Sequence, residues 1–219
     1  MSVRFREKGA LPRLCAFVAT AAFALSLAPA AARAQDAPYQ IYPTPQEITY
    51  GESSFILRDA ANIVVENGID ADTETRLNDV IKLKDIEADR SDTPSHSPRT
   101  LDILVGIEGS GGAVDSRIAD MKAAGEIAYP DDLFLHKDAY LLLAKAGGKD
   151  SPDTIAVLGA DTDAAFYGLT TLYQIFQQID GLRLRDLTVA DHADVITRGF
   201  IEGYYGNPWT TEDRVRLME

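Results

Sequence analysis

The chain has 219 residues, and its 34 acidic against 21 basic residues give a formal net charge of −13 at pH 7. A surface this acidic repels nucleic acids and anionic membranes, which excludes both as partners. The single cysteine excludes an internal disulfide, and the three histidines, His96, His136 and His192, stand singly with no metal-ligand spacing, so we expect no metal site.

The first 34 residues are typical of a secretory signal peptide. Basic residues precede an apolar run over residues 14–28, and Ala32-Arg33-Ala34 forms a small-x-small cleavage site before Gln35. The run is shorter than the roughly 20 apolar residues of a membrane span. An uncleaved anchor is the alternative. We therefore expect a secreted or periplasmic protein without a membrane span after cleavage, and a mature chain that has lost Cys15.

Residues 35–194 predict one α/β domain. Short aliphatic runs between polar breaks predict strands, and apolar residues at spacings of three and four predict helices. The expected strands are 54–57, 62–65, 101–106, 139–144 and 154–158, and the expected helices are 71–84, 114–124 and 164–179. Residues 87–99 are rich in serine, aspartate and proline without periodicity, which predicts a mobile loop.

A glycine-rich segment, residues 106–112, joins an expected strand to an expected helix, where a phosphate cradle would lie. A dinucleotide fingerprint counted from Gly109 needs a glycine at the position of Val114, and Glu108 would repel a phosphate. The segment is therefore interpreted as an ordinary strand-to-helix turn.

Asp131-Asp132 is the only adjacent pair of aspartates in the chain. The pair follows Pro130, and Pro-Asp-Asp is typical of a turn or a helix cap. We interpret it as structural and not catalytic.

Residues 195–219 have the pattern of a strand, a loop and a helix. β-Branched and aromatic residues at 195–197 and 200–201 predict a buried parallel strand, and a loop rich in glycine and aromatic residues follows over 202–208. Thr210 and Asp213 form a capping box with the shorter acid, so a helix should start after Thr210. This order is how a parallel α/β barrel begins, and in such barrels the loops after the strands build the active site.

The run R-G-F-I-E-G-Y-Y-G-N-P-W-T-T-E-D-R over residues 198–214 resembles the start of the catalytic barrel of glycoside hydrolase family 84. These β-N-acetylglucosaminidases include bacterial hyaluronidase-type enzymes and O-GlcNAcases, and Tyr204 stands where many members have phenylalanine. Residues 39–194 resemble the α/β domain that precedes the barrel in families 20 and 84, with Y-P-T-P-Q near its start and Y-G-L-T-T-L-Y-Q near its end.

The fold class implied by this resemblance is α/β. An N-terminal α+β sheet domain over 35–194 precedes the start of a (β/α)8 TIM barrel over 195–219. Such a barrel needs roughly 250 residues, so we expect a truncated product or a fragment.

The resemblance also implies a secreted hydrolase that removes terminal β-linked N-acetylglucosamine with retention, using the acetamido oxygen of the substrate as nucleophile. One aspartate of an adjacent pair would orient the acetamido group, and its neighbour would protonate the leaving oxygen. That pair is expected beyond Glu219, so this chain would hold no catalytic residue and would be inactive alone. No cofactor is implied, and the partner would be a glycan or glycoconjugate containing N-acetylglucosamine.

Gly203, Tyr204 and Tyr205 are the substrate-binding residues that the resemblance implies for this chain. The carbonyl of Gly203 would accept a hydrogen bond from a sugar hydroxyl, and the two tyrosines would line the pocket, although either could instead be barrel core. The role of Glu202 stays open between a structural carboxylate and a general acid. Trp209 is expected to pack between strand and helix.

Two other classes of protein stay open. A family 20 β-hexosaminidase would share the upstream domain, but its first barrel strand should continue Arg-Gly into an aspartate and an arginine-rich segment. A non-catalytic secreted domain could instead bind a glycan or a protein without turnover.

Overall fold

The structure is a computed structural model, and it describes residues 38–197, 199 and 209–218. The predicted signal peptide lies outside these residues, and so do Glu202, Gly203, Tyr204 and Tyr205. In the described part, no helix is long and apolar enough to cross a membrane.

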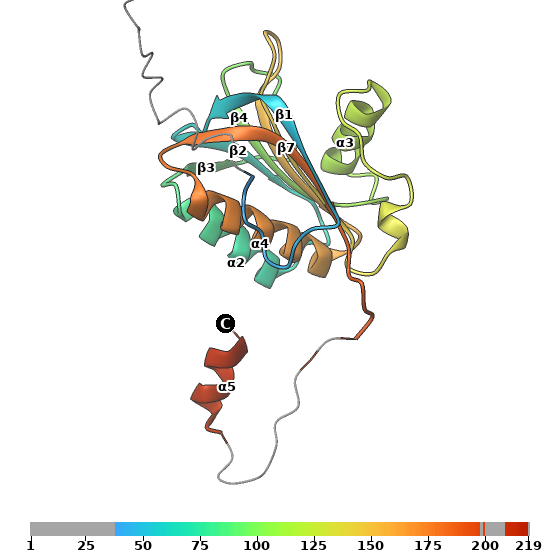
Figure 1. Cartoon of the computed structure of the whole chain (residues 1–219). Helices are drawn as coiled ribbons and strands as arrows, with labels where there is room; N and C mark the ends of the chain where they lie inside the picture. Colours follow the sequence, from blue (N-terminus) through green and yellow to red (C-terminus); the bar gives the residue numbers. More distant parts are fainter. Residues whose placement is uncertain (1–37, 198, 200–208, 219) are drawn as a thin grey trace, which may run out of the picture. The chain divides into compact units, whose positions relative to one another are not determined.

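Residues 38–197 form a seven-stranded mixed sheet with helices on both faces (Figure 1). All of the helices and strands expected between residues 54 and 179 are present, and their ends move by a few residues, except that the first strand begins seven residues earlier. In chain order the elements are β1 (Glu47–Ile56), β2 (Ala60–Val65), α2 (Ala71–Lys82), β3 (Glu87–Arg90), β4 (Leu101–Ile107), α3 (Ala113–Ala123), the 3-10 turn η1 (Leu133–Leu135), β5 (Tyr140–Lys145), β6 (Asp153–Gly159), α4 (Thr162–Gln178), β7 (Arg183–Asp191) and α5 (Thr211–Met218).

The strand order is β1-β7-β5-β6-β4-β2-β3. The half from β6 to β3 is parallel, and the half from β1 to β6 is antiparallel. Strand β7 runs between β1 and β5, so the last strand of the domain connects the first strand to the rest of the sheet.

Two apolar clusters cover the two faces of the sheet. On one face α2 and α4 pack against residues such as Ile103, Val157 and Leu142. On the other face α3 and the segment that follows it pack against residues such as Leu104 and Leu158. Strand β6 is buried along its whole length, which explains its continuous apolar sequence.

The loop expected over residues 87–99 begins only after residue 90, and its mobility stays a prediction. Residues Glu87–Arg90 form strand β3, parallel to β2, and hydrogen bonds attach the residues after it to the sheet. Asn62 donates to the carbonyl of Thr93 (3.2 Å), and the buried carboxylate of Asp102 accepts from the backbone N–H of Ser95 (2.9 Å). A buried carboxylate needs hydrogen-bond partners, and the loop supplies one of them to Asp102.

Strand β7 is absent from the expected set because the first half of its sequence, R-L-R-D-L-T-V-A-D, carries the charged residues Arg183, Arg185 and Asp186. Its apolar residues Leu184, Leu187 and Val189 belong to the core. Pairing with β1 and β5 makes this segment a strand.

The capping box at the start of α5 is confirmed. The N–H of Asp213 donates to Oγ1 of Thr210 (3.1 Å), and the N–H of Thr210 donates to Oδ2 of Asp213 (3.2 Å). Residues 195–197, expected to open a strand, have no strand partner among the described residues, and residues 200–201 lie outside them.

Candidate functional site

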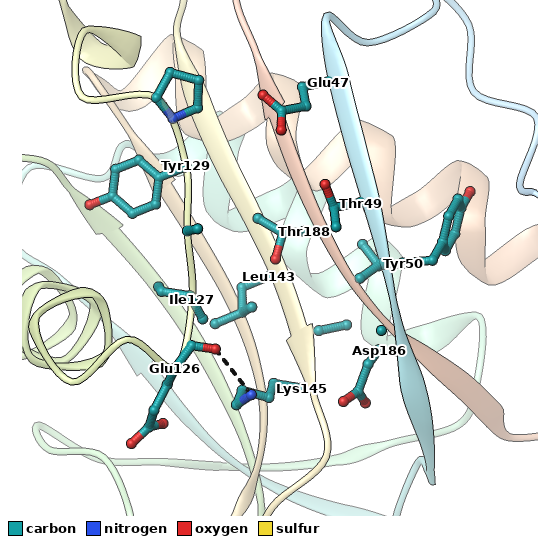
Figure 2. A pocket seen from close by; sticks show the side chains of 15 residues that line it. Glu47, Thr49, Tyr50, Glu126, Ile127, Tyr129, Leu143, Lys145, Asp186 and Thr188 are labelled. Carbon is teal, nitrogen blue, oxygen red and sulfur yellow. Dashed lines mark hydrogen bonds between the residues drawn. The ribbon is translucent and has the colours of Figure 1, made fainter.

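A groove of about 370 Å³ lies on the α3 face of the sheet, over β1, β7 and the end of β5. Figure 2 shows Thr49, Thr188 and Asp186 on the strands that form its floor, with Ile127 and Tyr129 on the segment that forms its opposite wall. Because α3 packs over β4 and β6, this part of the sheet face lies beside the helix.

The alternation of side chains along a strand explains the polar floor. On β1, Glu47 and Thr49 line the groove, whereas Ile48 between them packs against the core of the opposite face. On β7, Asp186 and Thr188 follow the same alternation. A polar residue at every second position is the signal by which the sequence could have revealed this groove.

The groove contains acceptors but no acid and base joined by a hydrogen bond among its described lining residues. Burial raises the pKa of Asp186, whose carboxylate accepts from the N–H of Ala146 (2.8 Å). Lys145 donates to the carbonyl of Glu126 (3.2 Å; Figure 2). Burial also raises the pKa of Tyr129. We therefore assign the groove no chemistry of its own.

The glycine-rich turn over residues 106–112 holds a carboxylate of the protein itself. Glu66, at the end of β2, accepts hydrogen bonds from the N–H groups of Val114 (2.6 Å) and Asp115 (2.9 Å) at the start of α3. Its second oxygen accepts from the N–H of Ile107 (3.1 Å) and from the hydroxyl of Ser110 (2.8 Å). The place where a phosphate would bind is filled, which agrees with the interpretation as a strand-to-helix turn.

The interpretation of Asp131-Asp132 as a turn is confirmed. Both residues lie in the turn before η1, and their side chains are 96% and 70% exposed. Asp131 accepts a hydrogen bond from Lys122 (2.7 Å), which lowers the pKa of its carboxyl group. Asp132 lies 3.8 Å from Nε2 of His136. Exposed, separately paired carboxylates do not form a catalytic pair.

A second polar cluster lies under the end of β7 and has no counterpart in the sequence analysis. The hydroxyl of Tyr140 lies 2.7 Å from that of Thr171 and donates to Asp191 (3.1 Å). Burial, followed by the negative charge of Asp191, raises the pKa of Tyr140. The neutral phenol of Tyr140 therefore has a structural role, because its hydrogen bonds join β5 to α4 and to β7.

The predicted substrate residues Gly203, Tyr204 and Tyr205 lie outside the described residues, so the geometry brings together none of them. Trp209 is described and its side chain is 47% exposed. Over the described residues there is no cluster of three or more histidine, cysteine, aspartate or glutamate side chains that could hold a metal ion.

Two family models match the chain. The model of glycosyl hydrolase family 20, domain 2, matches residues 38–192, and the model of beta-N-acetylglucosaminidase matches residues 198–219. The first match contains every strand of the described residues, and the second contains the motif that follows them.

Two of the solved structures that resemble the chain are members of the same series. The structure of CpGH84D is 40% identical over 83% of this chain and 28% of its own, with a TM-score of 0.74. The structure of CpGH84B is 22% identical over 83% of this chain and 27% of its own, with a TM-score of 0.61, a likeness of fold alone. The chain thus spans little more than a quarter of the length of either relative.

Proposed function

Because the chain belongs to the domain family named glycosyl hydrolase family 20, domain 2, and this domain is like the N-terminal domain of family 84, we propose that the chain is part of a secreted β-N-acetylglucosaminidase. Its substrates are glycans or glycoconjugates with terminal β-linked N-acetylglucosamine. The reaction retains configuration and uses the acetamido oxygen of the substrate as nucleophile.

The observation that carries this proposal is the order of the two matches. A domain that resembles CpGH84D at 40% identity ends at β7, and the beta-N-acetylglucosaminidase match begins seven residues later, at residue 198. That match contains Gly203, Tyr204 and Tyr205, which we propose as sugar-binding residues. Hydroxyl acceptors beside flat apolar side chains are the chemistry that a sugar pocket needs.

The domain over residues 38–197 has a supporting role in this proposal. Its one adjacent aspartate pair lies in an exposed turn, and its groove lacks a hydrogen-bonded acid and base among the described lining residues. The pair of aspartates that polarises the acetamido group and protonates the leaving oxygen belongs to the catalytic barrel. The 219-residue chain by itself is therefore inactive in our proposal.

The direct test is a chimera in which this chain continues in frame into the residues of CpGH84D that follow the matched part. The chimera should hydrolyse an aryl β-N-acetylglucosaminide, whereas the 219-residue chain should not. Loss of a general acid alone costs about 10²–10⁴ in rate, and the short chain also lacks most of the pocket.

Two variants of the chimera show where the chemistry lies. Tyr205→Ala should lower kcat/KM because it removes a wall of the sugar pocket, whereas Asp131→Asn combined with Asp132→Asn should leave kcat/KM unchanged. Turnover by the 219-residue chain, or loss of turnover in the double aspartate variant, would contradict the proposal.

A family 20 hexosaminidase is the second candidate, favoured by the match of the first model. It predicts that the chain continues into a barrel of that family. The match of residues 198–219 to beta-N-acetylglucosaminidase favours family 84 instead.

A further inference from the structure

The groove over β1, β7 and the end of β5 carries no reaction of its own, but its floor offers polar groups for binding. Thr49 and Thr188 are partners in the register of β1 and β7, and neither hydroxyl makes a hydrogen bond to another described residue. Asp186 accepts from the N–H of Ala146 with one carboxylate oxygen, and its other oxygen has no partner in the described part of the chain. The floor therefore presents two hydroxyls and one carboxylate oxygen to water or to a ligand.

Apolar side chains lie next to these polar groups. Leu143 on β5 is the register partner of Thr188, and Ile127 lines the groove from the wall that follows α3. Figure 2 shows Leu143 beside Thr188, with Ile127 on the side of the wall. A ligand that fits this lining has hydroxyl groups at its edge and C–H groups on its faces, which is the composition of a sugar ring.

The charges of the groove restrict which sugar can bind. The described lining residues include three carboxylates, those of Glu47, Glu126 and Asp186, and one amine, that of Lys145. The amine is already engaged with the carbonyl of Glu126 (3.2 Å), and the whole chain has a net charge of −13. A negative field of this kind repels anionic ligands. Uronic acids and sulfated sugars are therefore disfavoured, and neutral sugars are favoured.

The size of the groove limits the length of the ligand. Its volume of about 370 Å³ is near the lower end of the range for small-molecule sites, about 300–1,000 Å³. A ligand of one or two sugar rings suits this space, and the rest of a longer glycan would extend into solvent.

We propose that the groove is a second, non-catalytic sugar-binding site, which takes a neutral oligosaccharide of N-acetylglucosamine. The choice of sugar rests on the proposed function, whereas the groove itself selects for a neutral sugar. Thr49, Thr188 and Asp186 form hydrogen bonds with ring hydroxyls, and Leu143 and Ile127 contact the C–H groups. The site is separate from residues 198–219, so it holds one part of a glycan while the catalytic barrel acts on its terminal residue.

An NMR titration of the isotope-labelled 219-residue chain tests the site. The probe is the β-1,4-linked disaccharide of N-acetylglucosamine, and the backbone amide shifts report where it binds. Saturable shifts should occur at Thr49, Asp186 and Thr188.

Two variants test which groups bind the probe. Thr49→Val combined with Thr188→Val removes both hydroxyls and keeps β-branched residues that suit a strand. It should weaken the affinity about tenfold or more, because two hydrogen bonds are lost. Ser53→Ala removes an exposed hydroxyl from β1 outside the groove and should leave the affinity unchanged. The amide spectrum of each variant shows that its fold is intact.

Two further probes test the ligand class. A disaccharide with glucuronic acid in place of one N-acetylglucosamine unit should bind at least about fivefold more weakly, because the carboxylates of the groove repel it. A tripeptide of lysine should not displace the neutral disaccharide. If the tripeptide shifted the groove residues and the disaccharide did not, the proposal would be overturned, because the groove would then bind cationic peptides.

Other results would overturn the site in different ways. These are a lack of saturable shifts in the groove, and equal affinities of the natural chain and the double threonine variant. Shifts confined to residues 198–219 would also overturn it, but they would support Gly203, Tyr204 and Tyr205 as sugar-binding residues. Groove binding by the 219-residue chain together with an inactive CpGH84D chimera would support the site and count against the proposed function.

Discussion

At the scale of single residues, two buried carboxylates are stabilised by different means. Glu66 accepts four hydrogen bonds at the start of α3, where the helix dipole adds a favourable positive field. Asp102 accepts from Asn62 and from Ser95 on the same face of the sheet, and burial raises the pKa of its carboxyl group more than these bonds lower it. The first is an N-terminal cap supplied from another strand, and the second connects a loop to the sheet.

Glu66→Ala should lower the free energy of unfolding by about 3 kcal/mol, because it leaves the N–H groups at the start of α3 buried without an acceptor. The residue at the cap position of this helix, Gly112, has no side chain that could replace it. Urea denaturation measures the change. Glu108→Ala, at an exposed position in the same turn, should change stability by less than about 0.5 kcal/mol. Equal effects of the two substitutions would contradict the capping role.

The pH dependence of stability should have opposite signs at Asp102 and Asp70. Burial raises the pKa of Asp102, so its contribution to stability is complete below the unfolded value of about 3.9 and is lost as the pH rises through the folded pKa. The hydrogen bond from the N–H of Thr73 lowers the pKa of Asp70, which caps α2. Its contribution is present above the unfolded value and is lost as the pH falls through the folded pKa.

Substitution by asparagine isolates these two effects. The free energy of unfolding of the natural chain minus that of Asp102→Asn should fall as the pH rises from about 3 to 7, and the corresponding difference for Asp70→Asn should rise. Titration of all other groups cancels in each difference. If both differences changed in the same direction as the pH rises, the environment of one of the two carboxyl groups would be described wrongly.

At the scale of elements, helix α4 is determined by its sequence and adjusted by its contacts. Its apolar residues recur at spacings of three and four, and the side chain of Asp161 caps it by accepting from the N–H of Ala164 (2.9 Å). Gly168 interrupts the pattern for a tertiary reason. A Cβ at this position would lie 2.6 Å from Cγ1 of Val157 and 3.1 Å from Cδ2 of Tyr140.

Gly168→Ala should therefore destabilise the domain although alanine is the better helix former. Overpacking costs about 1–3 kcal/mol, and the gain in helix propensity returns about 1 kcal/mol. Gln177→Ala, at an exposed position of α4, should change stability by less than about 0.5 kcal/mol. Thermal unfolding of both variants measures the effect, and a more stable Gly168→Ala variant would show that α4 can move away from the sheet.

At the scale of the whole molecule, the described domain closes on itself at β7. This strand pairs with β1 on one side and with β5 on the other, so the sheet is complete at Asp191. Both apolar clusters draw their residues from before that point. Among the described residues, none after Asp191 belongs to either cluster, which agrees with the predicted boundary at residue 194; the boundary itself stays a prediction.

A chain ending at Asp194 should unfold in one cooperative transition, because it keeps the whole seven-stranded sheet and both apolar clusters. Circular dichroism at two wavelengths, which separate helix from aromatic packing, should give coincident melting curves. A broad transition, or two separate curves, would place part of the domain core beyond residue 194.

The sequence by itself determined the local elements and the family. Periodic apolar residues predicted α2, α3 and α4, continuous apolar runs predicted β4, β5 and β6, and the capping box predicted the start of α5. The resemblance to the domain that precedes the barrel in families 20 and 84 is confirmed by the family models and by CpGH84D. These features are short-range, so neighbouring residues contain the information.

Only the tertiary structure decided which contacts form between residues that lie far apart in the sequence. Strand β7 exists because β1 and β5 flank it, and residues 91–100 are held because Asn62 and Asp102 need partners. Glu66 fills the turn before α3 from a position 48 residues before Val114. The side-chain amide of Gln46 likewise donates to Asp194, 148 residues later in the chain. Hydrogen bonds and burial between such segments depend on the folded arrangement, and no local pattern in the sequence reports them.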